Sequence, residues 1–251
     1  MRIPASSGRG KSTDHRVTDV LKRLFDIVAA SLVLLVIAPL VLLPVAIIIV
    51  LESRGPAIFA QPRYGVGGRV FRMYKFRTMI QDSTNFLAEN PQLKRELEQN
   101  YKISNDPRIT RSGHTLRRLA IDELPQLLNV LKGEMSIVGP RPIPVYPSWL
   151  DEYGDRKDLL LSVRPGITGL WQVSGKNSLP MEEHVRLDLR YVTHRSIWMD
   201  TKIICKTVPV VAGLACDITP PSATPSVILV RAQAEREHEE ARAQSELTVR
   251  G

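Results

Sequence analysis

The most prominent feature of the hydrophobic pattern is one long apolar run near the N-terminus. No charged side chain occurs from Ile27 to Leu51, and nearly every residue in that interval is apolar. The run of about 25 residues exceeds the roughly 20 that an α-helix needs to cross a bilayer. It is too long for a signal peptide, and no small-residue cleavage site follows it. The pattern therefore predicts a membrane-inserted helix over residues 22–53, preceded by a flexible polar tail at 1–21.

Two prolines divide this predicted helix. Pro39 and Pro44 each remove a backbone hydrogen bond and bend a helix. Basic residues flank the run on both sides, so the positive-inside rule assigns no orientation to a straight span. A kinked helix that crosses the membrane satisfies the pattern, and so does a re-entrant helix that dips into one leaflet and returns. The residues by themselves leave both geometries open.

After residue 53 the pattern changes to short apolar segments separated by turn residues, and we interpret 54–216 as one domain. Extended runs on either side of a Gly-rich turn predict a hairpin within 57–80. Residues 217–251 predict a polar tail or solvated helix. The expected fold class is α/β, mostly helical and irregular. The predicted helical stretches are 82–103, 114–132, 148–162 and 181–215, with irregular chain at 133–147 and 163–180.

Charge narrows the classes of partner without choosing among them. The 251 residues carry a net charge of +8, which favours nucleic acid, anionic lipid or a phosphorylated substrate. Cys205 and Cys216 have no metal-ligand spacing and predict a reducing compartment. The histidines His114, His184 and His194 form no ligand pair at helical spacing, so we interpret them as structural or surface residues.

The most informative polar residues are the adjacent Asp122 and Glu123, inside the helical stretch 114–132. Apolar residues at three- and four-residue steps form one stripe there, and Asp122 projects away from it on the side of Arg118. Pro125 lacks an N–H donor, so the helix bends or restarts beside the pair. An acidic pair at a helix start often serves only as a cap. A carboxylate kept ionised by arginines could instead attack phosphorus or bind Mg²⁺.

Candidate cations lie in three other segments. Lys75 and Arg77 alternate with apolar residues, so an extended chain would place both on one face. A Gly-Pro-Arg-Pro sequence fixes the backbone around Arg141, and a Pro-Gly pair follows Arg164. Phosphoryl transfer is catalysed chiefly by positioning and charge neutralisation. Cations gathered around one carboxylate therefore predict a phosphoryl-transfer site, whereas cations without a common target would be ordinary surface residues.

Four motifs occur in a specific order and spacing. They are Tyr74-Lys75-Phe76-Arg77-Thr78-Met79, Asp122-Glu123-Leu124-Pro125-Gln126, Lys132-Gly133-Glu134-Met135-Ser136-Ile137-Val138-Gly139-Pro140-Arg141-Pro142 and Pro165-Gly166-Ile167-Thr168-Gly169-Leu170-Trp171-Gln172-Val173-Ser174-Gly175. Through them the chain, from about Lys22 to Val211, resembles the bacterial sugar transferase family. These are the monotopic phosphoglycosyl transferases that begin exopolysaccharide, capsule, O-antigen and glycoprotein glycan assembly.

The resemblance implies an undecaprenyl-phosphate sugar-1-phosphate transferase. Asp122 would be the nucleophile, taking the sugar phosphate from a UDP-sugar with release of UMP and passing it to polyprenol (undecaprenyl) phosphate. The family's cofactor is Mg²⁺, with Asp122 as its expected protein ligand. Glu123 would position groups or handle protons. Lys75, Arg117 and Arg141 match phosphate-binding residues of the family. The sugar stays open among glucose, galactose and N-acetylated sugars.

The resemblance also implies a location. The family's membrane helix is re-entrant and broken at a Ser-Pro pair, where this chain has Ala38-Pro39. The catalytic domain would lie on the cytoplasmic face of the bacterial inner membrane, with interfacial amphipathic helices placing the site at the headgroup level. A homo-oligomer is compatible with the sequence, and nucleic acid is not an expected partner. The competing interpretation is a non-enzymatic membrane-associated protein that binds anions, which explains the charge but not the carboxylate pair among arginines.

Overall fold

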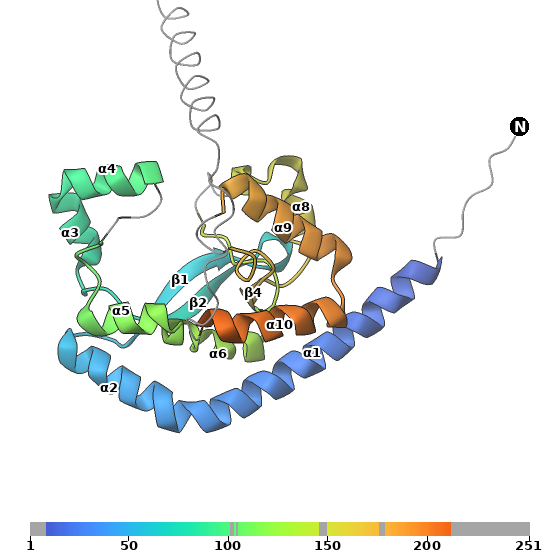
Figure 1. The fold of residues 1–251 in the computed structure, drawn as a ribbon, viewed down its shortest axis with the longest axis horizontal. Coiled ribbons are helices and arrows are strands. Elements are labelled where there is room, and N and C mark those ends of the chain that lie inside the picture. Colours follow the sequence, from blue (N-terminus) through green and yellow to red (C-terminus); the bar gives the residue numbers. More distant parts are fainter. Residues whose placement is uncertain (1–8, 101–102, 104, 146–149, 176–178, 212–251) are drawn as a thin grey trace, which may run out of the picture. The chain divides into compact units, whose positions relative to one another are not determined.

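The computed structural model describes residues 9–100, 103, 105–145, 150–175 and 179–211. The chain begins with one curved helical arc, which consists of α1 (Arg9–Ile37), a π-helical turn (Ala38–Leu42) and α2 (Leu43–Glu52) (Figure 1). Helix α1 begins at Arg9, so the helix extends into the stretch 1–21 that was predicted as a flexible tail. The tail predicted at 217–251 lies outside the described residues.

The two prolines lie where the hydrogen bonding of the arc changes. Neither Pro39 nor Pro44 has an N–H to donate. The N–H of Leu43 donates to the carbonyl of Ala38, five residues earlier, which closes a π turn. The wider turn accommodates the missing donors without ending the helix. The predicted break is therefore a local change of helix type inside a continuous arc (Figure 1).

The arc contacts the same domain at two places. Ala30, near the middle of the arc, is fully buried in a cluster with Phe71 and Leu127, and Ile49 of α2 is buried in a cluster with Phe76 and Leu116. Between these contacts most of the large apolar side chains are exposed. Thr18–Glu52 is long and apolar enough to cross a membrane, and only 6% of its most apolar 18-residue window is buried. The arc thus carries a large apolar surface that the protein itself does not cover, which indicates membrane association.

The predicted hairpin is confirmed. Strand β1 (Ile58–Tyr64) pairs antiparallel with β2 (Val70–Phe76), from Ile58 opposite Phe76 to Tyr64 opposite Val70. A short 3-10 turn, Val66–Gly68, joins them, and its two glycines have φ of 65° and 75°, which other residues rarely adopt. Buried side chains of β2 pack toward α1 and α6 (Gln126–Lys132), so the hairpin fixes the domain to the arc.

The polar stretch at 82–103 contains two short helices, α3 (Ser83–Glu89) and α4 (Pro91–Asn100). The stretch 114–132 was predicted as a helix that bends or restarts beside Asp122 and Glu123, and the structure divides it there into three pieces. They are α5 (Arg111–Arg118), a 3-10 turn (Ile121–Glu123) and α6. The interruption comes earlier than Pro125, because Ala120 adopts a left-handed conformation with φ of 52°.

The second half of the domain is built around a short parallel pair. Strand β3 (Ser136–Val138) pairs with β4 (Gly166–Thr168), and both strands lie in stretches that were predicted as irregular. A Cβ on Gly166 would lie 2.1 Å from the backbone nitrogen of Gly139, so only glycines allow this approach. The remaining described helices are α8 (Lys157–Leu160), α9 (Met181–His194) and α10 (Ile197–Val211), with a 3-10 turn at Gly154–Arg156.

Candidate functional site

The candidate site is centred on the 3-10 turn that carries Asp122 and Glu123. The left-handed residue Ala120 ends α5 and reverses the chain, at a cost of roughly 1 kcal/mol that glycine would avoid. Ile121 then packs against the cluster of Ile49, Phe76 and Leu116, to which α2 contributes Ile49. This packing fixes the turn, and with it both carboxylates, beside the apolar arc.

Glu123 is the point where two cations meet. Its Oε1 accepts hydrogen bonds from Lys75 Nζ at 2.9 Å and from Arg141 Nη2 at 3.0 Å. Burial by itself would raise the pKa of Glu123, but the charges of Arg141 and Lys75 outweigh it and lower the pKa to about 2. Glu123 is therefore an ionised carboxylate that holds the two cations, which favours its positioning role over proton handling.

Asp122 differs sharply from its neighbour. Its side chain is buried, with the residue 8% exposed, and no described residue donates a hydrogen bond to its carboxylate. Burial raises the pKa of Asp122, and the Glu123 charge adds to that rise, whereas Lys75, Arg117 and Arg141 oppose it. The result is a carboxylate that sits in a cationic environment without a bonded partner, so its oxygens are available to an incoming group.

Arg117 is oriented by the end of the hairpin. Its Nε donates to Thr78 Oγ1 at 2.8 Å, and the carbonyl of Thr78 accepts the N–H of Thr110, the N-cap residue of α5. Burial lowers the pKa of Arg117, and the nearby Asp122 opposes that effect. Thr78, two residues after β2, thus binds the Arg117 guanidinium through its hydroxyl and the N-cap of α5 through its carbonyl.

Arg141 has contacts on several sides. Besides Glu123, its guanidinium lies 6.0 Å from the ring centre of Trp171, which in turn stacks on His184 at 4.2 Å. The negative charge of Asp188 acts on Arg141 as well, and burial raises the pKa of Asp188 to about 7. Asp188 Oδ2 accepts from the buried Tyr153 hydroxyl, while Oδ1 is buried without a partner. Arg141 is therefore bound by Glu123, lies over the Trp171 ring and is influenced by the charge of Asp188.

Two of the predicted phosphate-binding residues do not join this group. Arg77 was expected on the same face as Lys75, but β2 ends at Phe76, and the Arg77 guanidinium donates to the carbonyls of Ser53, Arg54 and Gly55 instead. It fixes the turn after α2. The Nε of Arg164 donates to the carbonyl of Gly133, in a different part of the domain. The structure brings together Asp122, Glu123, Lys75, Arg117 and Arg141 only.

The sequence interpretation missed three neighbours of the predicted residues. Thr78 and Trp171 were part of the motifs, but no role was predicted for either side chain. Threonine hydroxyls often accept or donate local hydrogen bonds, which is the one general signal for Thr78. Asp188 was missed completely, because it lies in an amphipathic helix far along the chain and only the fold brings it near Arg141.

The donor set of the site can be compared with the needs of Mg²⁺. In the part of the chain that the structure describes, no three His, Cys, Asp or Glu side chains gather around one point. Glu123 is committed to Lys75 and Arg141, which leaves Asp122 as the available carboxylate. Mg²⁺ is commonly held by one or two carboxylates together with substrate phosphates and water. The site therefore fits a Mg²⁺ ion shared with a bound phosphate, but not one enclosed by protein alone.

An uncovered apolar helix beside an unpartnered carboxylate among cations defines a membrane-associated protein with a site for anionic groups. Residues 17–213 match the family described as bacterial sugar transferase, and the chain belongs to this family.

Curated relatives support the same placement. The chain is 43% identical over 200 residues to an undecaprenyl-phosphate galactose phosphotransferase of Salmonella typhimurium, a match that covers 78% of this chain and 41% of the relative. It is 42% identical over 194 residues to the exopolysaccharide production protein ExoY of Rhizobium meliloti, with 76% and 84% covered. A UDP-glucose:undecaprenyl-phosphate glucose-1-phosphate transferase of Escherichia coli is 43% identical over 202 residues, with 76% and 40% covered. The chain thus spans about two fifths of the length of several relatives.

Proposed function

We propose that the chain is a sugar-1-phosphate transferase that acts between a UDP-sugar and undecaprenyl phosphate. The observation that carries the proposal is Asp122, a buried carboxylate that lies among Lys75, Arg117 and Arg141 and accepts no hydrogen bond from any residue that the structure describes. The names of relatives that act on undecaprenyl phosphate support the choice of acceptor.

The proposed reaction has two displacements at one phosphorus atom. A carboxylate oxygen of Asp122 attacks the β-phosphorus of the UDP-sugar, the bond from that phosphorus to the bridging oxygen breaks, and UMP leaves with the bridging oxygen. A phosphate oxygen of undecaprenyl phosphate then attacks the phosphorus held on Asp122, and the bond to the carboxylate oxygen breaks. The product is an undecaprenyl diphosphate sugar, and the carboxylate is regenerated.

The cations have distinct proposed roles. Lys75 and Arg141, held by Glu123, would neutralise the oxygens of the diphosphate, and Arg117, oriented by Thr78, would approach from the side of α5. Because Glu123 already fixes both cations, little reorganisation is needed when the substrate binds. Mg²⁺, held by Asp122 and phosphate oxygens, would add further neutralisation of charge.

The membrane geometry fits a reaction between one soluble and one lipid-borne substrate. We infer that the arc is re-entrant, because the middle of the arc, through Ala30, and its C-terminal part, through Ile49, pack on one domain. Exposed apolar side chains on α6 and α10 would rest in the same interface, on what we infer to be the cytoplasmic face. They are Leu128, Leu131, Ile197, Trp198 and Val208.

The orientation can be tested with single cysteines in a background that lacks Cys205 and Cys216. Val20→Cys precedes the uncharged run, and Arg54→Cys follows it. A re-entrant arc makes both react with a membrane-impermeant maleimide from the same side of sealed vesicles. Labelling from opposite sides would show a spanning helix.

The activity test uses the purified full-length protein with Mg²⁺, a panel of UDP-sugars and a short polyprenol phosphate, and it measures free UMP. Asp122→Asn should lower UMP release by at least ~10³-fold, because an amide cannot form the covalent intermediate. The matched control is Asp155→Asn, which removes the same charge from an exposed position and should retain activity. If Asp122→Asn released UMP at the parent rate, the nucleophile would be wrong. If the parent released none with any sugar, the non-enzymatic anion-binding interpretation would be favoured.

A further inference from the structure

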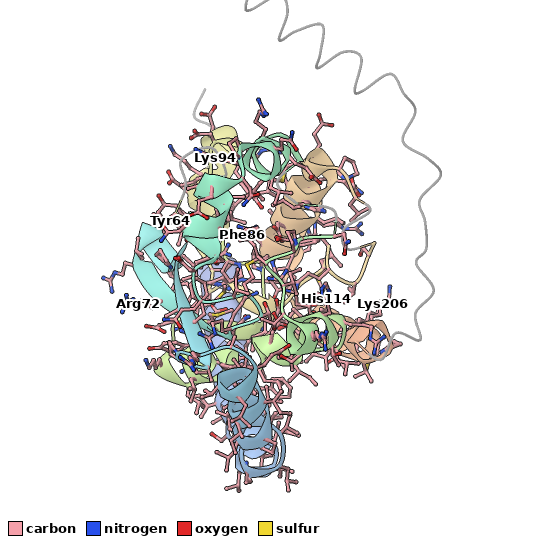
Figure 2. The ribbon with its side chains drawn as sticks, turned by 90° about the vertical axis from the view of Figure 1, so that its left-hand side faces the viewer. Tyr64, Arg72, Phe86, Lys94, His114 and Lys206 are labelled. Atoms are coloured by element: carbon pink, nitrogen blue, oxygen red, sulfur yellow. The ribbon has the colours of Figure 1, made fainter. Side chains whose placement is uncertain are left out.

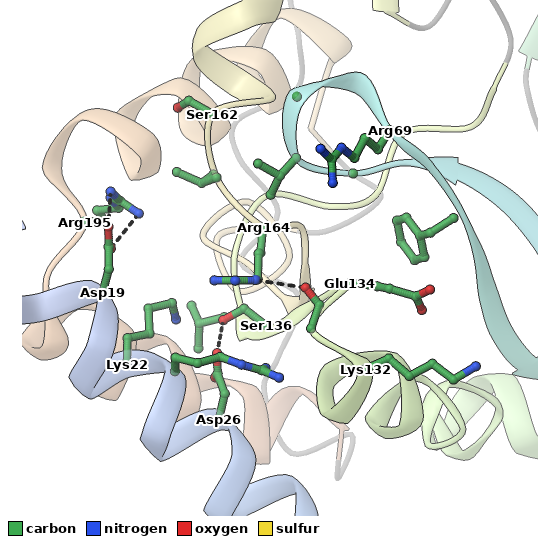
Figure 3. A pocket seen from close by; sticks show the side chains of 18 of the residues that line it. Asp19, Lys22, Asp26, Arg69, Lys132, Glu134, Ser136, Ser162, Arg164 and Arg195 are labelled. Carbon is green, nitrogen blue, oxygen red and sulfur yellow. Dashed lines mark hydrogen bonds and ion pairs between the residues drawn. The ribbon is translucent and has the colours of Figure 1, made fainter. Parts of the chain in front are cut away.

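A second group of cations lines a cavity that is not part of the candidate site. The cavity measures about 710 Å³ and lies between α1, the turn of the β1–β2 hairpin and the segment after α6 (Figure 3). We call it the basic pocket. Three carboxylates also face it: Asp19, Asp26 and Glu134. Its basic side chains are Lys22, Arg23, Arg69, Lys132, Arg164 and Arg195.

Part of this charge is neutralised within the protein. Arg195 forms an ion pair with Asp19 at 2.9 Å, visible at the edge of the pocket in Figure 3. Lys22 forms another with Asp200 at 2.7 Å. Asp26 is buried and accepts hydrogen bonds from the Ser136 hydroxyl and a backbone N–H. The charges of Arg195 and Lys22 are thus paired within the protein, whereas neutral donors hold Asp26 and leave its negative charge in the wall of the pocket.

Three guanidinium groups remain without a carboxylate partner. Arg164 donates to the carbonyl of Gly133 at 2.9 Å, and Arg23 donates to the carbonyls that end α6. The Arg69 guanidinium is exposed and makes no hydrogen bond or ion pair with any residue in the described part of the chain. A carbonyl fixes the direction of a guanidinium but does not cancel its charge. The planar fork of arginine matches the oxygens of a phosphate group, so this arrangement is suited to a phosphate.

The position of the pocket indicates where that phosphate comes from. Lys22 and Arg23 lie a few residues before Ile27, where the uncharged run of the arc begins. That boundary is the level of the lipid headgroups, where basic residues meet anionic lipid. Glu134 and Asp26 are the two lining carboxylates that form no ion pair within the described part of the chain, and Asn129 Nδ2 donates to Glu134.

The pocket is separate from the site around Asp122. Val70 and Phe71, at the start of β2, line the pocket, whereas Lys75, near the end of β2, binds Glu123. Phe71 and Lys75 are four residues apart, which is about 13 Å at ~3.3 Å per residue of strand. A phosphate in the pocket is therefore too distant to be the group on which Asp122 acts.

We propose that the basic pocket binds the phosphate group of an anionic membrane lipid, with Arg69, Arg164 and Arg23 as its donors. A bound lipid would hold the base of α1 at the membrane surface. The proposal does not depend on the reaction at Asp122, and its test measures binding rather than turnover.

The test uses full-length protein in a neutral detergent and counts retained phosphatidylglycerol by native mass spectrometry. The parent should retain one lipid at low lipid concentration. Arg69→Gln combined with Arg164→Gln should weaken retention by about tenfold or more, because each removes charge-assisted hydrogen bonds. Arg69→Gln alone should give a smaller loss in the same direction, and it changes an exposed side chain that holds nothing else in place.

The matched control is Arg72→Gln combined with Arg156→Gln, which removes the same two charges from exposed positions. Arg72 lies three residues from Arg69 and points away from the domain (Figure 2). If the control variant retains lipid within twofold of the parent, the proposed pocket is supported. If the control loses as much lipid as the pocket variant, the effect is one of net charge alone, and the proposal is wrong. A second arm adds inorganic phosphate without lipid. If phosphate protected the parent against thermal unfolding while no lipid was retained, the assignment to a lipid would be wrong.

Discussion

The two cationic regions at either end of β2 are built in opposite ways. Around Asp122, the cations Lys75 and Arg141 are held by a carboxylate, Glu123, and the Lys75 side chain is largely buried. In the basic pocket, Arg164 and Arg23 are held by backbone carbonyls, and Arg69 is exposed. The first arrangement fixes positions at the expense of net charge, whereas the second keeps the charge.

The difference is informative about the ligand that each region suits. A reaction centre needs cations that do not move when substrate binds, because misplacement by about 1 Å can reduce rates by ~10²-fold. A lipid site needs net positive charge at the headgroup level and tolerates mobility. Lysine and arginine side chains therefore indicate catalysis around Asp122 and ligand binding in the basic pocket. The two regions differ in whether a carboxylate or a backbone carbonyl holds the cations.

The largest effect among variants that keep the nucleophile is expected for Glu123→Gln. It leaves Lys75 and Arg141 without their shared carboxylate, so the two cations repel each other and lose their fixed positions. We expect kcat for UMP release to fall by about 10²-fold, with about 3 kcal/mol lost from the free energy of unfolding. Steady-state kinetics and thermal unfolding in detergent measure the two effects.

Glu182→Gln is the control for that variant, since it removes an exposed carboxylate in the first turn of α9. It should change neither quantity appreciably. Full activity of Glu123→Gln would show that Lys75 and Arg141 are positioned by something other than the carboxylate, and the contrast between the two regions would disappear.

A second expectation concerns Asp188, whose negative charge acts on Arg141. Its pKa is raised to about 7 from 3.8, so between these values the folded protein binds a proton that the unfolded chain has released. The free energy of unfolding therefore falls as pH rises through that window, by up to about 4 kcal/mol. Asp188→Asn, which carries no charge at any pH, should remove most of this slope. Thermal unfolding midpoints from about pH 4 to about pH 8 test it, and an unchanged slope in the variant would contradict the raised pKa.

The sequence predicted the parts of this architecture that depend on local chemistry. The apolar run gave the arc, and the Gly-rich turn gave the hairpin, because both signals lie within a few consecutive residues. The restart beside Asp122 was predicted from Pro125, and α6 begins directly after that residue, whereas the left-handed conformation of Ala120 was not predicted. Alanine rarely adopts the left-handed conformation, so no signal in the sequence identifies it.

The composition of the site was predictable only in part. Asp122, Glu123, Lys75, Arg117 and Arg141 were all named from motifs, and the structure places them together. The placement of Arg77 beside Lys75 was wrong because the alternation continues in the sequence after the strand has ended at Phe76. The placement of Arg164 in the site was wrong because a Pro-Gly pair fixes the local backbone but does not determine which residues lie opposite the side chain. The tertiary fold decides which cationic side chains lie around Asp122, and the spacing of residues in the sequence does not predict it.

A smaller effect is expected from Thr78→Val, which keeps the shape of the side chain but removes the acceptor for Arg117 Nε. Loss of one hydrogen bond to a charged group corresponds to about 1.5 kcal/mol, or roughly tenfold in kcat. Thr78→Ser should restore most of the rate, because it retains the hydroxyl. If Thr78→Val and Thr78→Ser were equally impaired, packing of the methyl group rather than the hydrogen bond would be responsible.

The smallest and most discriminating effect is expected from Glu134→Gln, because its sign differs from that of Glu123→Gln. In the basic pocket a carboxylate opposes an anionic ligand, whereas Asn129 can still donate to the amide oxygen of the glutamine. Removing one charge at a distance of several ångströms in a solvated pocket is worth about 0.5 kcal/mol, so lipid retention should rise about twofold. The gain should shrink at high salt, since the interaction is screened. A loss of retention would mean that Glu134 organises the pocket as Glu123 organises the site, and the two regions would then follow one design.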